Sequence, residues 1–345
     1  MSHIAPTENQ GNDVEAVEKL HRHYQELNEQ MKGVIVGLDD VIEQLLIIIL
    51  CRGHGMLEGV PGLAKTLIVS TLSSLLNLSF RRIQFTPDLM PSDITGTEIL
   101  EEDNTTGKRF FRFIKGPLFA NIVLADEINR TPPKTQSALL EAMQERQVTV
   151  AGATHALPDP FFVLATQNPI EQEGTYTLPE AQLDRFMLKI EVGYPERLDE
   201  IDIVKRATTG YRFQTKEVIT GDEIIALQDL VRKVPVADHV YEFAVDLARR
   251  SRPGTGAGNG TVASEDMINW GAGPRASICL IMAAKARAIL QGRFHTTTDD
   301  ICAVAPPVLR HRLVPTFNAE AAGKTANDIV RDLVQEMRIV SPHRG

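Results

Sequence analysis

Residues 59–66, Gly-Val-Pro-Gly-Leu-Ala-Lys-Thr, have the residue types and spacing of a phosphate-binding loop. Such a loop wraps phosphate oxygens with successive backbone N–H groups at the start of a helix, whose dipole adds positive potential. The lysine reaches the β- and γ-phosphates, and the following Ser or Thr holds Mg²⁺. We therefore interpret the segment as a nucleotide site formed by Gly59, Val60, Pro61, Gly62, Leu63, Ala64, Lys65 and Thr66, with Thr66 also a metal ligand.

Ala64 departs from the loop pattern, which has glycine immediately before the lysine. The alanine adds one methyl group, and we expect it to be tolerated if its backbone stays in right-handed space. Gly62 supplies a permissive point and Pro61 stiffens the turn. A chance loop of small residues is the alternative, and the segment alone does not exclude it.

Acidic and amide side chains follow two further apolar runs. Residues 122–127, Ile-Val-Leu-Ala-Asp-Glu, read as a buried strand that ends in two carboxylates. Asp126 is expected to hold Mg²⁺, and Glu127 to polarise the attacking water as general base. The run at 161–166 leads into Asn168, which could contact the γ-phosphate or orient the water, although Asn-Pro is also a common turn.

These residues require an α/β scaffold that brings strand ends together. Apolar, strand-like runs at 54–59, 80–86, 121–126, 161–166 and 187–192 alternate with helical patterns at 65–77, 135–146 and 181–186. The alternation predicts a parallel sheet covered by helices on both faces, with ligands at the carboxyl ends of its strands. Amphipathic patterns precede it from Asp13 onward.

The second half of the chain changes character after Pro195, because only helical patterns follow and no convincing strand pair interrupts them. We therefore predict a flexible tail (1–12), an α/β P-loop NTPase core (13–193) and an all-α domain (194–345). The glycine-rich segment 251–264 does not complete a dinucleotide-binding pattern, and we expect a loop there.

Composition narrows the class of protein. The net charge is −9 over 345 residues, which argues against a general binder of nucleic acids or membrane surfaces. The longest apolar run is far too short to span a membrane, and the start of the chain lacks the pattern of a secretory signal. Three widely spaced cysteines favour neither a disulfide framework nor a zinc site, so we expect a cytoplasmic protein.

The order of these motifs resembles the AAA+ ATPases. The segments GVPGLAKT, IVLADEINR, ATQNP and LDRF follow one another in the order that is typical of this family. Their residues are similar to those of the MoxR subgroup, whose loop commonly has Ala before the lysine. EAMQERQVT (141–149) and LPEAQLDRF (178–186) resemble that subgroup as well. The resemblance is strong over residues 34–193 and weaker beyond. It implies AAA+ architecture, in which a helical lid follows the core and a ring of subunits, here a hexamer, holds ATP between neighbours.

The resemblance also implies roles for individual residues. Val36 and Gly37, in the turn 34–37, would form the adenine pocket, although an ordinary turn between helices is the alternative. Arg275, in GAGPRAS (271–277), looks like the second sensor, which contacts the γ-phosphate. A neighbouring subunit should supply an arginine finger, for which Arg185 of LDRF is the first choice and Arg130 and Arg146 are the rivals.

The function that the resemblance implies is a Mg²⁺-dependent ATPase that remodels or assembles a partner protein, including metal or cofactor insertion. The family's habitual partners have von Willebrand A domains. Two segments, 97–113 and 147–161, read as hairpins that could face the ring axis or a client, or be ordinary surface hairpins.

Three other functions stay open at this point. A magnesium-chelatase-like motor subunit is the nearest, although Pro179 stands where that family often has an arginine. A DNA motor is disfavoured by the acidic charge balance. An ATP-dependent scaffold without turnover is disfavoured by the intact Asp126-Glu127 pair.

Overall fold

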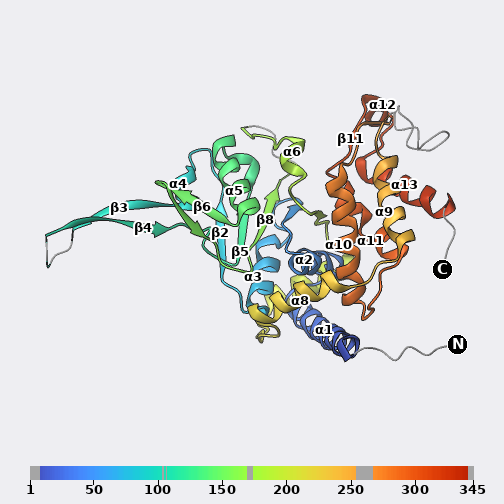
Figure 1. The fold of residues 1–345 in the computed structure, drawn as a ribbon, viewed down its shortest axis with the longest axis horizontal. Coiled ribbons are helices and arrows are strands. Elements are labelled where there is room, and N and C mark those ends of the chain that lie inside the picture. Colours follow the sequence, from blue (N-terminus) through green and yellow to red (C-terminus); the bar gives the residue numbers. More distant parts are fainter. Residues whose placement is uncertain (1–7, 103–104, 106, 169–173, 254–266, 341–345) are drawn as a thin grey trace.

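The protein is built around a five-stranded parallel sheet with the strand order β2-β5-β8-β1-β9 (Figure 1). The structure is a computed structural model that describes residues 8–102, 105, 107–168, 174–253 and 267–340. The sheet strands are β1 (Gly55–Glu58), β2 (Phe80–Gln84), β5 (Ile122–Asp126), β8 (Phe162–Gln167) and β9 (Leu188–Glu191). Each overlaps one of the five runs predicted as strands, so the parallel sheet is confirmed.

Both faces of this sheet are buried. In β5, Ile122 and Leu124 belong to one apolar cluster, whereas Val123 and Ala125 belong to the other. The split follows from the period of two in a strand, which sends successive side chains to opposite faces. Helices α2 (Asp39–Leu50) and α3 (Lys65–Leu75) cover the first face, and α5 (Pro133–Glu145) covers the second. The sheet therefore lies between helices, as predicted.

The first helix is longer than its apolar periodicity indicated. Helix α1 spans Glu8–Val34, so helical structure begins inside the segment 1–12 that we expected to be a tail. Residues 8–12 are polar and include Gly11 and two asparagines, so neither apolar periodicity nor helix propensity indicated a helix there. Residues 1–7 lie outside the described part of the chain.

Two hairpins leave the core at the predicted places. Strands β3 (Gly96–Glu102) and β4 (Arg109–Lys115) pair antiparallel along their whole length and project far from the sheet (Figure 1). Strands β6 (Gln147–Val150) and β7 (Ala153–Ala156) form the second hairpin. Its turn residues Ala151 and Gly152 have φ of 50° and 85°, which matches the two-residue turns favoured by right-twisted strands. Short elements α4 (Pro91–Thr95), η1 (Ile128–Arg130) and α6 (Glu180–Leu183) connect the rest of the core.

The C-terminal half is helical apart from one short strand pair, which the sequence did not predict. Its helices are α7 (Arg197–Thr208), α8 (Gly221–Lys233), α9 (Asp238–Arg250), α10 (Pro274–Leu290), α11 (Thr298–Leu309), α12 (Phe317–Ala321) and α13 (Ala326–Val340). The expectation of no strand pair was wrong, because β10 (Ile268–Trp270) pairs antiparallel with β11 (Val314–Pro315). These strands are too short and too far apart in sequence to give a periodic signal. Most of the predicted loop 251–264 lies outside the described residues.

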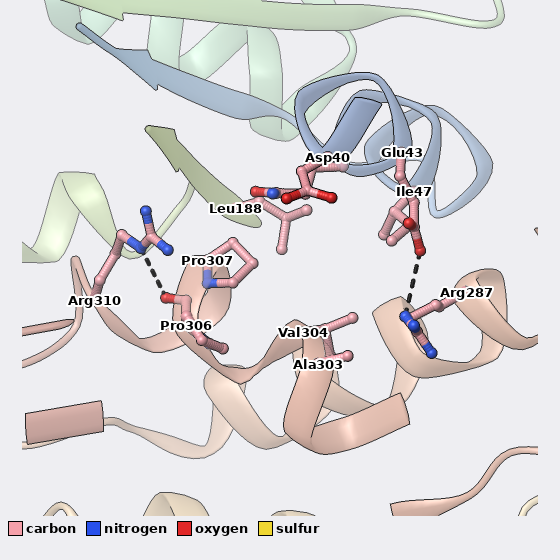
Figure 2. A pocket seen from close by; sticks show the side chains of 11 residues that line it. Asp40, Glu43, Ile47, Leu188, Arg287, Ala303, Val304, Pro306, Pro307 and Arg310 are labelled. Carbon is pink, nitrogen blue, oxygen red and sulfur yellow. Dashed lines mark hydrogen bonds and ion pairs between the residues drawn. The ribbon is translucent and has the colours of Figure 1, made fainter. Parts of the chain in front are cut away.

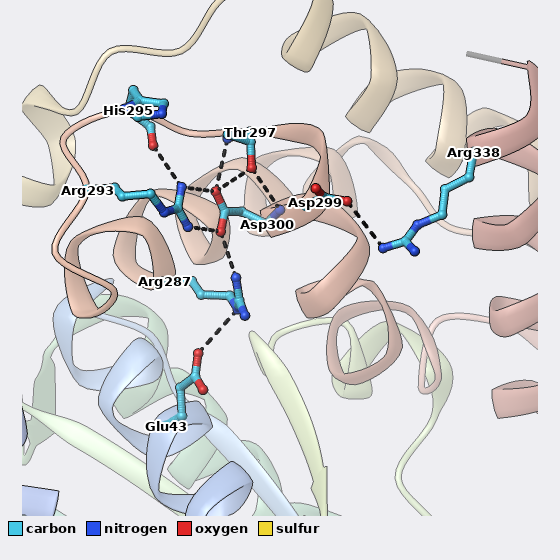
Figure 3. Close-up of polar contacts among 8 residues, drawn as sticks. All are labelled: Glu43, Arg287, Arg293, His295, Thr297, Asp299, Asp300 and Arg338. Carbon is cyan, nitrogen blue, oxygen red and sulfur yellow. Dashed lines mark hydrogen bonds and ion pairs between the residues drawn. The ribbon is translucent and has the colours of Figure 1, made fainter. Parts of the chain in front are cut away.

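Ion pairs join this helical half to the core. Arg287 of α10 lies 3.3 Å from Glu43 of α2 and 2.8 Å from Asp300 of α11, whose side chain is fully buried (Figure 3). Arg293 also binds Asp300, at 2.6 Å. A cavity of about 280 Å³ opens between α2 and α11 beside this network (Figure 2). Helix α8 packs against both α2 and α10, so the two halves share one apolar core.

Within the described residues, none of the helices combines the length and apolarity needed to cross a membrane.

Candidate nucleotide site

The loop 59–64 connects β1 to α3 and opens onto a cavity of about 400 Å³ at the carboxyl edge of the sheet. The N-cap residue of α3, Ala64, makes no side-chain capping hydrogen bond, so it leaves the first N–H groups of the helix to an anion. Lys65 Nζ donates to the carbonyl oxygen of Gly59 and lies 3.4 Å from that of Val60. The cavity is lined by Pro61, Gly62, Leu63, Ala64, Lys65, Thr66, Leu67, Arg82, Asp126, Glu127 and Asn168.

Glycine is required at the start of the loop. A Cβ atom at Gly59 would stand 2.6 Å from the carbonyl oxygen of Val192 on the neighbouring chain segment. Gly62 has φ of 88°, a left-handed conformation that glycine adopts without a steric cost. The loop therefore depends on both glycines for its path.

The conformation of Ala64 corrects the expectation from the sequence. Its φ and ψ are 54° and 20°, which is left-handed and not right-handed space. The pattern's glycine suits this conformation, whereas the Cβ atom of an L-residue makes it costly by roughly 1–2 kcal/mol. The alanine is thus tolerated with strain, because the loop has to turn sharply into α3.

Asp126 is held by partners on both of its carboxylate oxygens. Oδ1 accepts a hydrogen bond from the buried hydroxyl of Thr166 at 2.5 Å. Oδ2 lies 2.5 Å from Nη2 and 2.9 Å from Nε of Arg82. Thr166 is on the adjacent strand β8 and Arg82 on β2, so both neighbours of β5 in the sheet orient this carboxylate.

Glu127 follows directly in a left-handed conformation, with φ of 58°. Its backbone N–H donates to Thr166 Oγ1 at 2.8 Å, which fixes the turn after β5. Its Oε2 accepts from Gln84 Nε2 at 2.7 Å and from Arg130 Nη1 at 2.9 Å. The side chain is mostly buried, and these two donors set its direction.

Lys65 carries the main positive charge of the loop. Partial burial lowers the pKa of its ammonium group, whereas the negative charges of Asp126, Glu127 and Glu58 act in the opposite direction. The lysine therefore lies in an acidic environment that a bound phosphate would change. Asn168, buried at the end of β8, completes the rim of the cavity.

The donor set fits Mg²⁺. This ion prefers oxygen ligands from one or two carboxylates or hydroxyls together with substrate phosphates. Asp126 and Thr66 offer a carboxylate and a hydroxyl on the same cavity wall as Lys65. The structure thus brings together the predicted phosphate loop, the two acids and Asn168.

Comparison with known proteins identifies the family. A model of the AAA ATPases (ATPase family associated with various cellular activities) matches residues 54–188, and one of the AAA lid domain matches residues 261–333. The chain is 43% identical over 310 residues to Chaperone MoxR1 of Mycobacterium tuberculosis, covering 90% of this chain and 80% of that protein. The chain belongs to the MoxR family of AAA+ ATPases.

Two other relatives of this MoxR-family chain are informative. The crystal structure of a proposed ATPase from Cytophaga hutchinsonii superimposes with a TM-score of 0.87 at 40% identity, covering 95% of this chain and 98% of that one. The magnesium-chelatase 38 kDa subunit of Acidiphilium rubrum is 30% identical over 200 residues, which is 54% of this chain and 51% of that subunit. The AAA core followed by a helical lid is therefore confirmed, and the MoxR relatives match more of the chain.

The four arginines considered for γ-phosphate contacts lie in different surroundings. Arg275 is not among the residues that line the phosphate cavity. Its guanidinium group lies 3.0 Å from the carboxylate of Asp184. Arg185 directly follows Asp184 in the chain, and its Nη1 atom lies 3.4 Å from the carbonyl oxygen of Leu140. The two rivals contact their own chain: Arg130 binds Glu127, and Arg146 Nη2 lies 3.3 Å from the carbonyl oxygen of Arg52.

The predicted adenine residues lie between α1 and α2. Gly37 has φ of 73°, and a Cβ atom there would stand 2.2 Å from Oδ2 of Asp199 on α7. Val36 is half-buried beside it. Neither residue lines the phosphate cavity, so their role toward adenine remains a prediction.

Sequence reasoning missed three polar residues of the site, namely Arg82, Gln84 and Thr166. Arg82 and Gln84 alternate along β2 and therefore face the same way, and Gln84 is in register with Asp126. The signal of Arg82 and Gln84 was the strand-like run 80–86, whose neighbour became known only when the strand order placed β2 beside β5. Thr166 lies in the predicted strand run 161–166, on β8.

Proposed function

We propose that this chain binds and hydrolyses ATP with Mg²⁺. The observation that carries the proposal is the single cavity that joins the phosphate loop, Asp126, Glu127 and Asn168. When bound, Mg²⁺ would neutralise charge on the phosphates. Thr66 and Asp126 are the residues that would hold it.

The protein's own groups have distinct tasks in this proposal. The N–H groups of the loop and Lys65 bind and orient the phosphates. Glu127, held by Gln84 and Arg130, accepts the proton of the attacking water. Asn168 orients that water or binds the γ-phosphate.

Arg185 is proposed to act as the arginine finger at a neighbouring subunit's nucleotide in a ring, and Arg275 as the second sensor that contacts the γ-phosphate. Both are exposed, and both adjoin Asp184, away from the phosphate cavity of their own chain. The exposed ion pair of Arg275 with Asp184 can change partners at little cost, because surface ion pairs are weak. Arg130 is the less suitable finger because it already binds Glu127.

The work done with ATP is proposed to be remodelling of a client protein, with a von Willebrand A domain partner and metal or cofactor insertion as the more specific possibilities. The β3–β4 hairpin supports a contact with a client, since it projects from the core and exposes Leu100, Phe110 and Phe111 (Figure 1). Exposed apolar groups of this size on a projecting element are typical of a binding surface.

Nucleotide binding is the direct test of this proposal. Lys65→Ala should lose affinity for a fluorescent ATP analogue, because the loop loses its only lysine, whereas Lys134→Ala, an exposed lysine on α5, should bind as the wild type does. Unchanged affinity in Lys65→Ala would show that residues 59–66 do not bind the phosphates.

Two alternative functions are less well supported than this one. A magnesium-chelatase-like motor would share the same nucleotide chemistry, so only the client distinguishes it. A scaffold that binds ATP without turnover would require Glu127 to be dispensable, and its placement between two donors argues against that.

A further inference from the structure

Arg82 occupies the carboxylate oxygen that a metal ion would need. Its Nη2 and Nε atoms lie 2.5 and 2.9 Å from Oδ2 of Asp126, which makes this a short, charge-assisted contact. The other oxygen of the carboxylate, Oδ1, is already turned toward Thr166, whose side chain is buried. Oδ2 is therefore the oxygen that Asp126 presents to the cavity.

The position of Arg82 is that of a displaceable group. Its side chain is 48% exposed, whereas that of Asp126 is 12% exposed. The arginine can thus move into solvent while the carboxylate stays fixed by Thr166. A guanidinium group and a divalent cation repel each other strongly at the separation that a shared oxygen would impose.

We propose that Arg82 is a positioning residue that competes with Mg²⁺ for Oδ2 of Asp126. The inference rests on the proposed function of this site and adds a residue outside the phosphate loop and the two acids. Arg82 keeps Oδ2 occupied and its charge compensated until Mg²⁺ arrives with the nucleotide, while Thr166 fixes the other carboxylate oxygen. Binding of the metal then requires release of Arg82.

Hydrogen bonds connect Arg82 to Glu127, the proposed general base, through Gln84. Arg82 Nη2 also donates to Gln84 Oε1 at 2.7 Å, and Gln84 Nε2 donates to Glu127 Oε2 at 2.7 Å. The chain of contacts runs Asp126–Arg82–Gln84–Glu127 across the ends of β2 and β5. Departure of Arg82 removes one of the bonds that orient Gln84, so occupancy at Asp126 alters the restraint on Glu127.

The test measures metal affinity and needs no turnover. The protein is saturated with a fluorescent, non-hydrolysable ATP analogue and titrated with Mg²⁺ in wild type, Arg82→Gln, Arg82→Lys and Arg81→Gln. Arg81 is the matched control, because it is the exposed neighbour on the opposite face of β2. Thermal unfolding of each variant confirms that it is folded.

The half-saturating Mg²⁺ concentration should fall about two- to fivefold in Arg82→Gln, the factor that loss of one partly exposed ion pair gives. Arg82→Lys should lie between, because a lysine keeps the charge without the two-point contact, and Arg81→Gln should equal the wild type. An unchanged or higher Mg²⁺ requirement in Arg82→Gln would overturn the competition. Failure of the wild type to bind the analogue at all would instead refute the proposed function.

Discussion

The strain at Ala64 leads to a quantitative prediction, in which Ala64→Gly stabilises the protein. The left-handed conformation costs an L-residue roughly 1–2 kcal/mol, and Ala64 has φ of 54°. Glycine gains back flexibility in the unfolded chain, which offsets about 0.4–1 kcal/mol of this. The net gain lies between about 0 and 1.6 kcal/mol, with a central value of about 0.8 kcal/mol, which raises the unfolding temperature by about 1 °C in a protein of this size.

Two control variants make this measurement specific. Ala151→Gly replaces another left-handed alanine, with φ of 50°, in the β6–β7 turn away from the phosphate cavity, and should give a similar gain. Ala138→Gly lies inside helix α5 and should instead destabilise by about 1 kcal/mol. All three are compared with the wild type by thermal unfolding without nucleotide.

A fall in the unfolding temperature of Ala64→Gly, alongside a rise in Ala151→Gly, would refute the reasoning. It would indicate that residue 64 is right-handed in the protein, the condition under which the sequence analysis expected the methyl group to be tolerated. The same variants answer whether the methyl group slows nucleotide exchange, which should differ from wild type in Ala64→Gly and not in Ala151→Gly.

Two further predictions concern the core. Burial lowers the pKa of His54 to about 4, and its ring joins Met143 to Val163 by hydrogen bonds of 3.0 Å. The folded protein favours the neutral ring of His54. The contribution of this ring to the free energy of unfolding is therefore complete above pH 6.5 and is lost as the pH falls toward 4. Between pH 6.5 and 4, the free energy of unfolding in urea should therefore fall by roughly 3 kcal/mol less in His54→Gln than in the wild type. An identical fall in both proteins would contradict the low pKa of His54. Arg287→Met should destabilise by about 2 kcal/mol, because buried Asp300 loses one of its arginines; Arg338→Met, an exposed pair member (Figure 3), should match wild type by thermal unfolding, and equal effects would contradict the coupling.

The candidate site at the edge of the sheet was predictable from sequence because its residues lie at strand ends. Asp126 and Asn168 follow uninterrupted apolar runs, and parallel strands bring their carboxyl ends to one edge. The phosphate loop was predictable because its glycines and its lysine lie within one short segment, residues 59–66.

Other features depend on packing that the sequence does not show locally. Arg82 and Gln84 gain their partners only through the strand order, and Gln84 pairs with a residue forty-two positions away, Asp126. The φ of Ala64 is imposed by the turn into α3, not by alanine's own preference. The strand pair β10–β11 joins segments too short to give a pattern. The contact of Arg275 with Asp184 likewise depends on how the lid meets the core.

Phosphate release by wild type and by Glu127→Gln tests the central claim most directly. With saturating Mg²⁺ and ATP, the wild type should release phosphate, and Glu127→Gln should release it at least about a hundredfold more slowly, because general-base catalysis is lost. The variant should still bind the ATP analogue, since Glu127 is not part of the loop that binds phosphate. Equal rates in the two proteins would contradict the assignment of Glu127 as the base and of this cavity as the site of hydrolysis.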